Sequence, residues 1–164
     1  MSFQKQVNAN QALGNVGQIS KAHHSFLNVI PAIAADDFVK VGSFVQSSST
    51  ATNENEVIGA SGKQITGSIL GVVVRDSLKV AGDSTPTLEV KKGENCAILT
   101  EGSIFIEVNV IAKKGQYVFL KTADGSLGFY NASTQNDYTY TGFRVSKGND
   151  TATAGLIEIT TARA

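Results

Sequence analysis

A two-residue alternation of apolar and polar side chains recurs through much of this sequence. At residues 103–110, Ile104, Ile106 and Val108 share one side of an extended chain, while Glu107 and Asn109 point to the other. Further predicted strands lie at residues 38–45, 65–75, 87–90, 96–100, 117–121, 127–130, 138–141 and 156–160, and turns that contain glycine separate most of them. Many short strands with regular turn signals predict an all-β fold, as a single β-sandwich or barrel, with a jelly-roll-like topology among those left open.

Two stretches depart from the alternation. Residues 31–35 read Pro-Ala-Ile-Ala-Ala, which predicts one helical turn because proline is tolerated at the first position of a helix. Residues 47–56 are almost entirely polar and have little to bury, so we expect an exposed loop there.

The charge balance bears on possible partners. Fourteen basic and fourteen acidic residues cancel, and they are scattered along the chain. Binding to a phosphate backbone needs a basic surface, so nucleic acid is not an expected partner. Charged residues make up 17% of the chain, against about 25% in a typical domain. Neighbouring molecules that cover the surface would explain this low value, and so would a β-rich composition alone.

Length and hydropathy suggest one domain outside the membrane. The chain has 164 residues, and no apolar run approaches the roughly 20 residues that span a bilayer. The first residues lack the layout of a secretion signal, so we expect synthesis in the cytoplasm. We predict an extended N-terminal arm at residues 1–22 and a single β-domain at residues 23–164.

The predicted arm carries a few apolar residues among Gln, Asn, Gly and Lys. They are Phe3, Val7, Leu13, Val16 and Ile19. Over 22 residues this spacing suits neither an amphipathic helix nor a regular strand. We therefore interpret these five residues as anchors that bind a partner surface or a sister subunit and contribute little to folding. A frayed terminus is the alternative.

Residues that could perform chemistry are few. His23 and His24 are adjacent, so in an extended segment they point to opposite sides and do not converge on a metal. Cys96 lies in an apolar strand without a neighbouring histidine, which predicts a buried, inert thiol. Asp36 and Asp37 follow the predicted helical turn and are expected to cap or turn the chain. We therefore predict a protein that is not an enzyme, with no catalytic residue, metal, cofactor or small-molecule substrate.

The order of segments resembles the structural cement, or decoration, proteins of tailed bacteriophages. The resemblance covers most of the chain and lies in the order of its segments. The motifs are an entry segment with glycines at residues 12–19, Val-x-x-Gly-x-Phe-Val at 39–45, a strand with an isolated glycine at 70–74, a glycine-bearing hairpin at 115–125, and closing strands at 141–144 and 155–159. Family members often carry prolines in the entry segment, where this chain has Leu13 and Gly14.

The resemblance implies a structural role in the virion. A protein of this family would bind the outer surface of an assembled head, bridge neighbouring major capsid subunits and stabilise the shell, and a homo-oligomer (dimer or trimer) is expected. Two other functions stay open on the sequence. One is a tail-tube or head–tail joining subunit, and the other is a β-sandwich module that recognises receptors or glycans.

Overall fold

The protein is all-β, as the alternation predicts. The computed structural model describes residues 14–20, 27–48, 53–75, 88–149 and 155–161, and this part of the chain contains strands but no helix. The strands are β1 (Asn28–Ala34), β2 (Val39–Lys40), β3 (Phe44–Ser47), β4 (Glu56–Gly59), β5 (Ile69–Val73), β6 (Glu89–Val90), β7 (Asn95–Glu101), β8 (Ser103–Val108), β9 (Tyr117–Lys121), β10 (Leu127–Tyr130), β11 (Tyr138–Lys147) and β12 (Gly155–Thr161).

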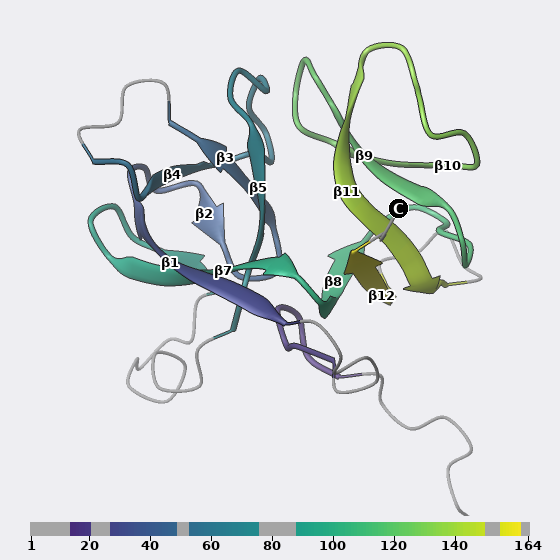
Figure 1. The fold of residues 1–164 in the computed structure, drawn as a ribbon, viewed down its shortest axis with the longest axis horizontal. Coiled ribbons are helices and arrows are strands. Elements are labelled where there is room, and N and C mark those ends of the chain that lie inside the picture. The colour runs from purple at the N-terminus through teal and green to yellow at the C-terminus, as the bar shows by residue number, and fades with distance from the viewer. Residues whose placement is uncertain (1–13, 21–26, 49–52, 76–87, 150–154, 162–164) are drawn as a thin grey trace, which may run out of the picture.

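The strands form a closed barrel and a second sheet that packs beside it. The barrel has the order β1-β4-β3-β5-β7, and the second sheet has the order β10-β9-β11-β12-β8. β2 and β6 pair separately as a short ribbon. In Figure 1 the barrel lies on the left and the second sheet on the right. The chain passes from the barrel to the sheet between β7 and β8, at Gly102, whose φ of 132° suits glycine.

Two hydrophobic cores hold this arrangement together, and neighbouring residues of one strand contribute to both. The side chains of Val45, Val73 and Ile98 belong to the core inside the barrel. Phe44, Val72 and Leu99 belong to the core between the barrel and the second sheet. Because successive side chains of a strand point to opposite faces, strands with both faces covered are apolar without interruption.

The predicted helical turn at residues 31–35 is wrong, because most of it lies in β1. Pro31 pairs with Ala97 of β7 in an antiparallel register. On the other side of β1, the pairing with β4 is confined to Ile33 and Ala34. Pro31 therefore lies where β1 has no second neighbour and where its missing amide hydrogen costs no sheet hydrogen bond. The sequence shows no alternation in β1, because both of its faces carry apolar side chains.

The strand predicted at residues 38–45 is interrupted by a turn. Gly42 adopts a φ of 75°, and the Ser43 amide donates to the carbonyl of Lys40 at 3.1 Å. β2 and β3 consequently belong to different sheets. Of the predicted strand at 65–75 only residues 69–73 are in β5, and β11 continues to residue 147, well beyond the predicted 138–141. β4 and the N-terminal part of β1 were not predicted.

Candidate functional site

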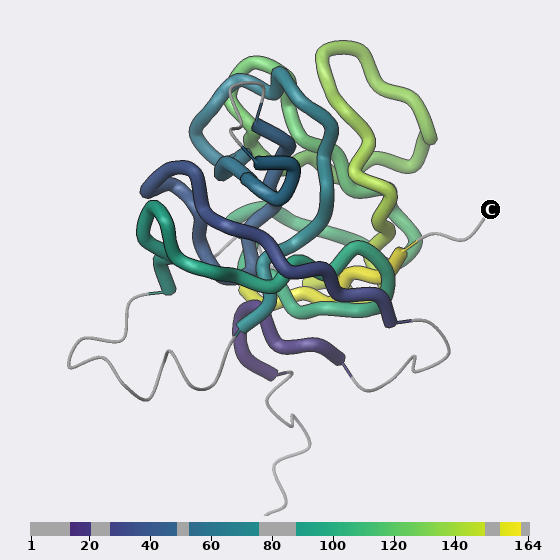
Figure 2. Tube along the Cα trace, turned by 60° about the vertical axis from the view of Figure 1, so that its left-hand side comes forward, coloured from purple at the N-terminus to yellow at the C-terminus, as the bar shows by residue number. Residues whose placement is uncertain are grey.

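Residues 14–20, here called the lead-in segment, lie against the outer edge of β8 and one end of the barrel (purple in Figure 2). The Gly17 amide donates to the carbonyl of Phe105 at 2.8 Å, and the Phe105 amide donates to the carbonyl of Gln18 at 3.0 Å. The Ser20 amide donates to Ser103, and the Arg75 amide donates to Gly17, both at 2.8 Å. These bonds attach the segment to both the second sheet and the barrel.

Two glycines allow the lead-in segment to approach the turn between β2 and β3. A Cβ on Gly17 would lie 2.3 Å from Cγ1 of Val41, and a Cβ on Gly42 would lie 2.3 Å from Cγ1 of Val16. Both glycines have a positive φ, 73° and 75°, which side chains rarely adopt. The structure thus brings together two glycine motifs that are far apart in the sequence.

The five predicted anchors fall on both sides of the boundary of the described chain. Phe3, Val7 and Leu13 lie outside the described residues, as do His23 and His24. Val16 is half-buried next to Gly42, and Ile19 bridges Ile104 of β8 and packs against the core between the sheets. The structure therefore places Val16 and Ile19 against the chain's own body, whereas their role in binding a partner stays a prediction.

The residues considered for chemistry have structural surroundings. Cys96 is half-buried in β7 and packs against the barrel core, so it is more exposed than predicted. One carboxylate oxygen of Asp36 accepts from the amides of Phe38 at 3.0 Å and Gly59 at 3.3 Å, and the other is 2.5 Å from Lys63 Nζ. Asp37 accepts from the Lys92 amide at 2.9 Å. Both aspartates hold turns, as predicted.

The described part of the chain was compared with the requirements of metal sites and ligand pockets. No cluster of three or more His, Cys, Asp or Glu side chains lies in it. The described residues form no helix, and therefore no helix among them could cross a bilayer. Two hollows lined by described residues have volumes of about 260 and 270 Å³, whereas pockets for small molecules are usually about 300–1,000 Å³.

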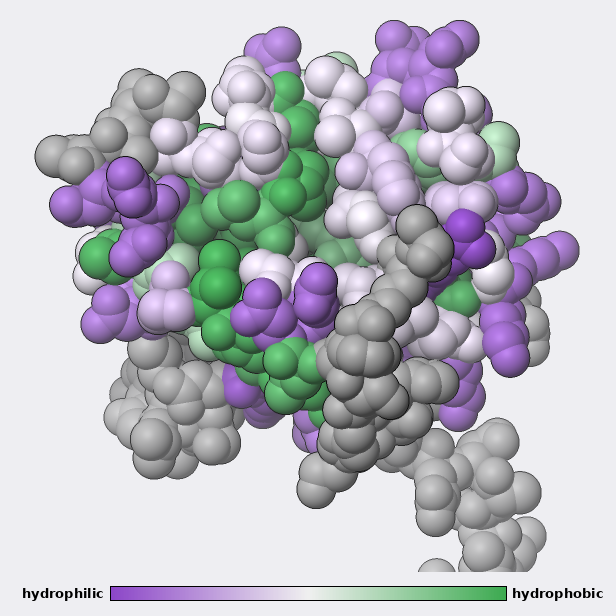
Figure 3. Space-filling view, in the orientation of Figure 1, coloured by the Kyte–Doolittle hydropathy of each residue, from purple (hydrophilic) through white to green (hydrophobic). Residues whose placement is uncertain are grey.

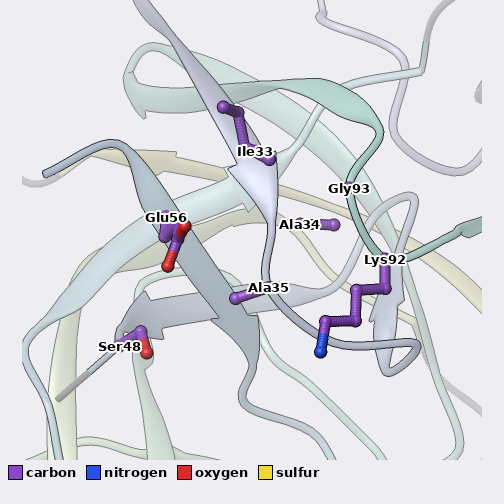
Figure 4. A pocket seen from close by; sticks show the side chains of 7 residues that line it. All are labelled: Ile33, Ala34, Ala35, Ser48, Glu56, Lys92 and Gly93. Atoms are coloured by element: carbon purple, nitrogen blue, oxygen red, sulfur yellow. The ribbon is translucent and has the colours of Figure 1, made fainter. Parts of the chain in front are cut away.

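The first hollow lies at the C-terminal end of β1, and the second lies between the barrel and the second sheet. Figure 4 shows the first, with Lys92 and Glu56 at its border. Its lining residues are Ile33, Ala34, Ala35, Ser48, Glu56, Lys92 and Gly93. The second is lined by Ile69, Leu70, Thr100, Glu101, Thr141, Gly142, Phe143 and Thr161. Both are of a size that admits protein side chains.

An apolar stripe runs along the outward face of β1. Ile30, Ala32 and Ala34 point into the barrel core, so the alternate residues Val29, Pro31 and Ile33 face outward. Leu27, just before the strand, is 54% exposed and Val29 is 38% exposed. We call these four residues the β1 stripe. Figure 3 shows apolar surface over the barrel and in the depression between the barrel and the second sheet.

Other exposed apolar side chains lie elsewhere on the surface. Phe38 follows β1 at the barrel and is 53% exposed, with Lys63 Nζ 4.2 Å from its ring centroid. Val110 and Ile111 follow β8 of the second sheet and are 39% and 47% exposed. Since Val110 and Ile111 lie at the second sheet whereas Phe38 and the β1 stripe lie at the barrel, the exposed apolar surface is divided among separate places.

All four tyrosines of the chain gather on the face of the second sheet that is turned away from the barrel. Tyr140 packs on Tyr117 and on the buried Phe119, with centroid distances of 5.5 and 5.4 Å. Tyr130 contacts Phe119 and Tyr138. Burial raises the pKa of Tyr140, and a hydrogen bond with Tyr138 raises the pKa of Tyr130. The rings mainly contact one another, so this cluster covers the outer face of the sheet.

The features of the described residues point to a protein that binds other proteins. These residues form an all-β body that presents apolar side chains at several places and has small hollows. Such a body is suited to binding other protein surfaces.

Comparison with known proteins agrees with this class. The family model for "Structural cement protein (E217 gp24/Pam3 gp6)" matches residues 3–162. The chain therefore belongs to the phage structural cement protein family, as the resemblance predicted, and this membership supports a structural role in the capsid. No curated protein matches the sequence.

A solved structure shows the same fold. A chain from "The capsid of Myoviridae Phage XM1" superimposes with a TM-score of 0.58 at 17% sequence identity. The match covers 98% of this chain and 97% of that chain, so the likeness includes both the barrel and the second sheet.

Proposed function

We propose that this protein binds the outer surface of an assembled phage head, bridges neighbouring major capsid subunits and stabilises the shell. It would be made in the host cytoplasm and become part of the virion. Membership in the structural cement family supports this proposal. Its partners would be proteins, namely the major capsid protein and further copies of itself, without nucleic acid, membrane or small-molecule substrate.

The observation that carries the bridging role is the division of the exposed apolar surface. Phe38 lies at the barrel, whereas Val110 and Ile111 lie at the end of β8 in the second sheet. A bridging protein must contact two subunits at once, so it needs more than one contact area. These two places could each supply one.

The stabilising effect would follow from linked equilibria. A ligand that binds the mature lattice better than the immature lattice shifts the shell toward the mature form. Because each copy makes two contacts and the second is effectively intramolecular, two weak contacts can give strong binding together. A single contact area could therefore be modest in strength.

The test is co-sedimentation with phage heads that lack the protein. We expect binding to expanded heads and much weaker binding to unexpanded shells. Replacing Val110 and Ile111 together with serine should weaken binding about tenfold or more, since burial of such side chains contributes about 1.5–3 kcal/mol each. Replacing the neighbouring exposed Lys114 with serine is the control. Equal binding to both kinds of shell, or none, would overturn the proposal.

The size of the protein in solution separates the other functions. A tail-tube or joining subunit should form rings or polymers, whereas a decoration protein should remain a small oligomer. Binding to a glycan array would instead support a receptor-recognition module.

A further inference from the structure

The β1 stripe has no cover in the described part of the chain. A strand with polar residues outside and apolar residues inside is the usual arrangement at a water-exposed barrel face. β1 instead carries Val29, Pro31 and Ile33 on its outward face. From Leu27 to Ile33 the stripe spans six residue steps, or about 20 Å at the rise of a strand. It ends at the hollow that Ile33 helps to line (Figure 4).

Residues 1–13, which precede the lead-in segment, alternate between apolar and polar side chains and could therefore match the apolar β1 stripe. The odd-numbered positions are mostly apolar, and the even-numbered positions are polar up to Asn10. The odd positions are Met1, Phe3, Lys5, Val7, Ala9, Gln11 and Leu13, and the even ones are Ser2, Gln4, Gln6, Asn8, Asn10 and Ala12. In an extended conformation this sequence would present one apolar and one polar face. The alternation ends at the glycines of the lead-in segment, which is why residues 1–22 taken as a whole do not suit a regular strand.

The dimensions of the two segments agree. Phe3 to Ala9 covers six residue steps, the same number as Leu27 to Ile33. Thirteen extended residues reach at most about 45 Å. This is longer than the roughly 30 Å given by twice the radius of gyration expected for a domain of this size. Residues 1–13 are therefore long enough to reach a neighbouring molecule.

The point where these residues join the body favours a neighbour as their binding partner. A Cβ on Gly14 would lie 2.6 Å from the ring of Phe105. Ile104 and Ile106 point toward the barrel, so the Phe105 side chain points to the opposite face of the second sheet. Gly14, at which the described part of the chain begins, thus lies on the face of the second sheet turned away from the barrel, whereas the β1 stripe lies on the barrel.

We propose that residues 1–13 of one copy bind, in extended form, along the β1 stripe of a neighbouring copy, with the odd-numbered side chains against the stripe. The even-numbered Gln and Asn side chains face water. The contact joins decoration proteins to one another, in addition to any contact with the capsid subunits.

The first test uses a fluorescent peptide of residues 1–13 and the protein lacking those residues. We expect saturable binding by fluorescence anisotropy. Replacing Phe3 and Val7 in the peptide with serine should weaken binding at least tenfold, whereas replacing Gln4 and Gln6 with serine should leave it within twofold. On the protein, Val29→Lys with Pro31→Lys should abolish binding, and Val110→Lys with Ile111→Lys is the matched control. Circular dichroism and melting curves verify that each variant is folded.

The second test distinguishes a neighbour's stripe from the molecule's own stripe. Two full-length variants are prepared, one with Phe3 and Val7 replaced by serine and one with Val29 and Pro31 replaced by lysine. In analytical ultracentrifugation each alone should remain monomeric where the native protein associates. A mixture should recover association, because the intact residues 1–13 of one variant can bind the intact stripe of the other.

Three results would overturn the proposal. The first is peptide binding that Val29→Lys with Pro31→Lys does not weaken. The second is association that persists without residues 1–13. The third is a mixture of the two variants that fails to associate although the native protein does. Both tests use the protein without phage heads. Their failure therefore leaves the capsid-binding proposal unaffected, and failure to bind heads leaves this contact unaffected.

Discussion

At the scale of single residues, Gln46 shows how a buried polar group can fix a loop. Its side chain is fully buried in β3. The amide oxygen accepts from the amides of Thr66 at 2.8 Å and Gly67 at 2.9 Å, and the amide nitrogen donates to the carbonyl of Gln64 at 3.0 Å. One side chain thus positions the segment that leads into β5.

Replacing Gln46 with leucine should lower the free energy of unfolding by about 2–4 kcal/mol. The backbone groups of Gln64, Thr66 and Gly67 would lose their partners, and each buried unpaired group costs about 1–3 kcal/mol, partly relieved by rearrangement of the loop. Urea unfolding measures the change. Gln116→Leu is the control, because it removes an exposed hydrogen bond to Lys113 that water can replace. Equal losses for the two variants would contradict this account.

A second residue-scale prediction concerns the contact between Gly42 and Val16. Gly42→Ala should cost about 2–4 kcal/mol, because the alanine is strained at a φ of 75° and its Cβ meets Val16. Gly93→Ala, at a φ of 84° with no atom near its Cβ, should cost only about 1–2 kcal/mol.

A double-mutant cycle with Val16→Ala separates the two causes. If the clash with Val16 contributes, Gly42→Ala should cost less in the Val16→Ala background. An unchanged cost would mean that backbone strain accounts for the whole effect and that the contact carries none of it.

At the scale of elements, the lead-in segment supports the body from the edge of β8. Three backbone hydrogen bonds join it to β8, and a fourth joins it to Arg75. Ile19 adds apolar contact with the core between the sheets. We therefore propose that the part of the chain devoted to partners ends at Leu13, earlier than the boundary after residue 22 that the sequence suggests.

Removing residues 1–13 should leave the melting temperature within a few degrees of the native value. Removing residues 1–20 should lower the melting temperature further, because the free energy of unfolding should fall by about 2–4 kcal/mol. The physical reason is the loss of the backbone hydrogen bonds, at about 0.5–1.5 kcal/mol each, and of the Ile19 contact, less the conformational entropy regained. Differential scanning calorimetry on the two truncated proteins measures the difference. Equal melting temperatures would show that the lead-in segment adds nothing to folding.

At the scale of the whole molecule, the barrel and the second sheet share a core, so they should act as one rigid unit. Phe44, Val72 and Leu99 of the barrel meet Ile104, Ile157 and Phe143 of the second sheet there. Phe44 and Phe143 pack edge to face, with ring centroids 5.7 Å apart. A unit of this kind can keep two contact areas at a fixed separation, as a bridge between subunits requires.

Saturating expanded heads with the protein should raise the temperature at which they release their DNA. At a free concentration of one hundred times the Kd, binding stabilises each site by about 2.7 kcal/mol. A DNA-binding dye added during heating measures release. The Val110→Ser, Ile111→Ser protein at the same concentration is the control and should give a smaller shift. If both proteins raise the release temperature equally, Val110 and Ile111 are not part of the capsid contact.

The sequence by itself determined the all-β class and the family resemblance, because the alternation at residues such as Ile104 and Ile106 is a local property of the chain. It also placed Asp36 and Asp37 correctly in turns. For Asp36 the reason is local, because its carboxylate accepts from the Phe38 amide two residues later, whereas Asp37 accepts from the distant Lys92 amide. Only the tertiary structure decided that β1 is a strand, because both of its faces are apolar and no period is visible. The same holds for the buried role of Gln46 and for the contact between Gly17 and Gly42, since each depends on segments distant in the sequence that only folding brings together.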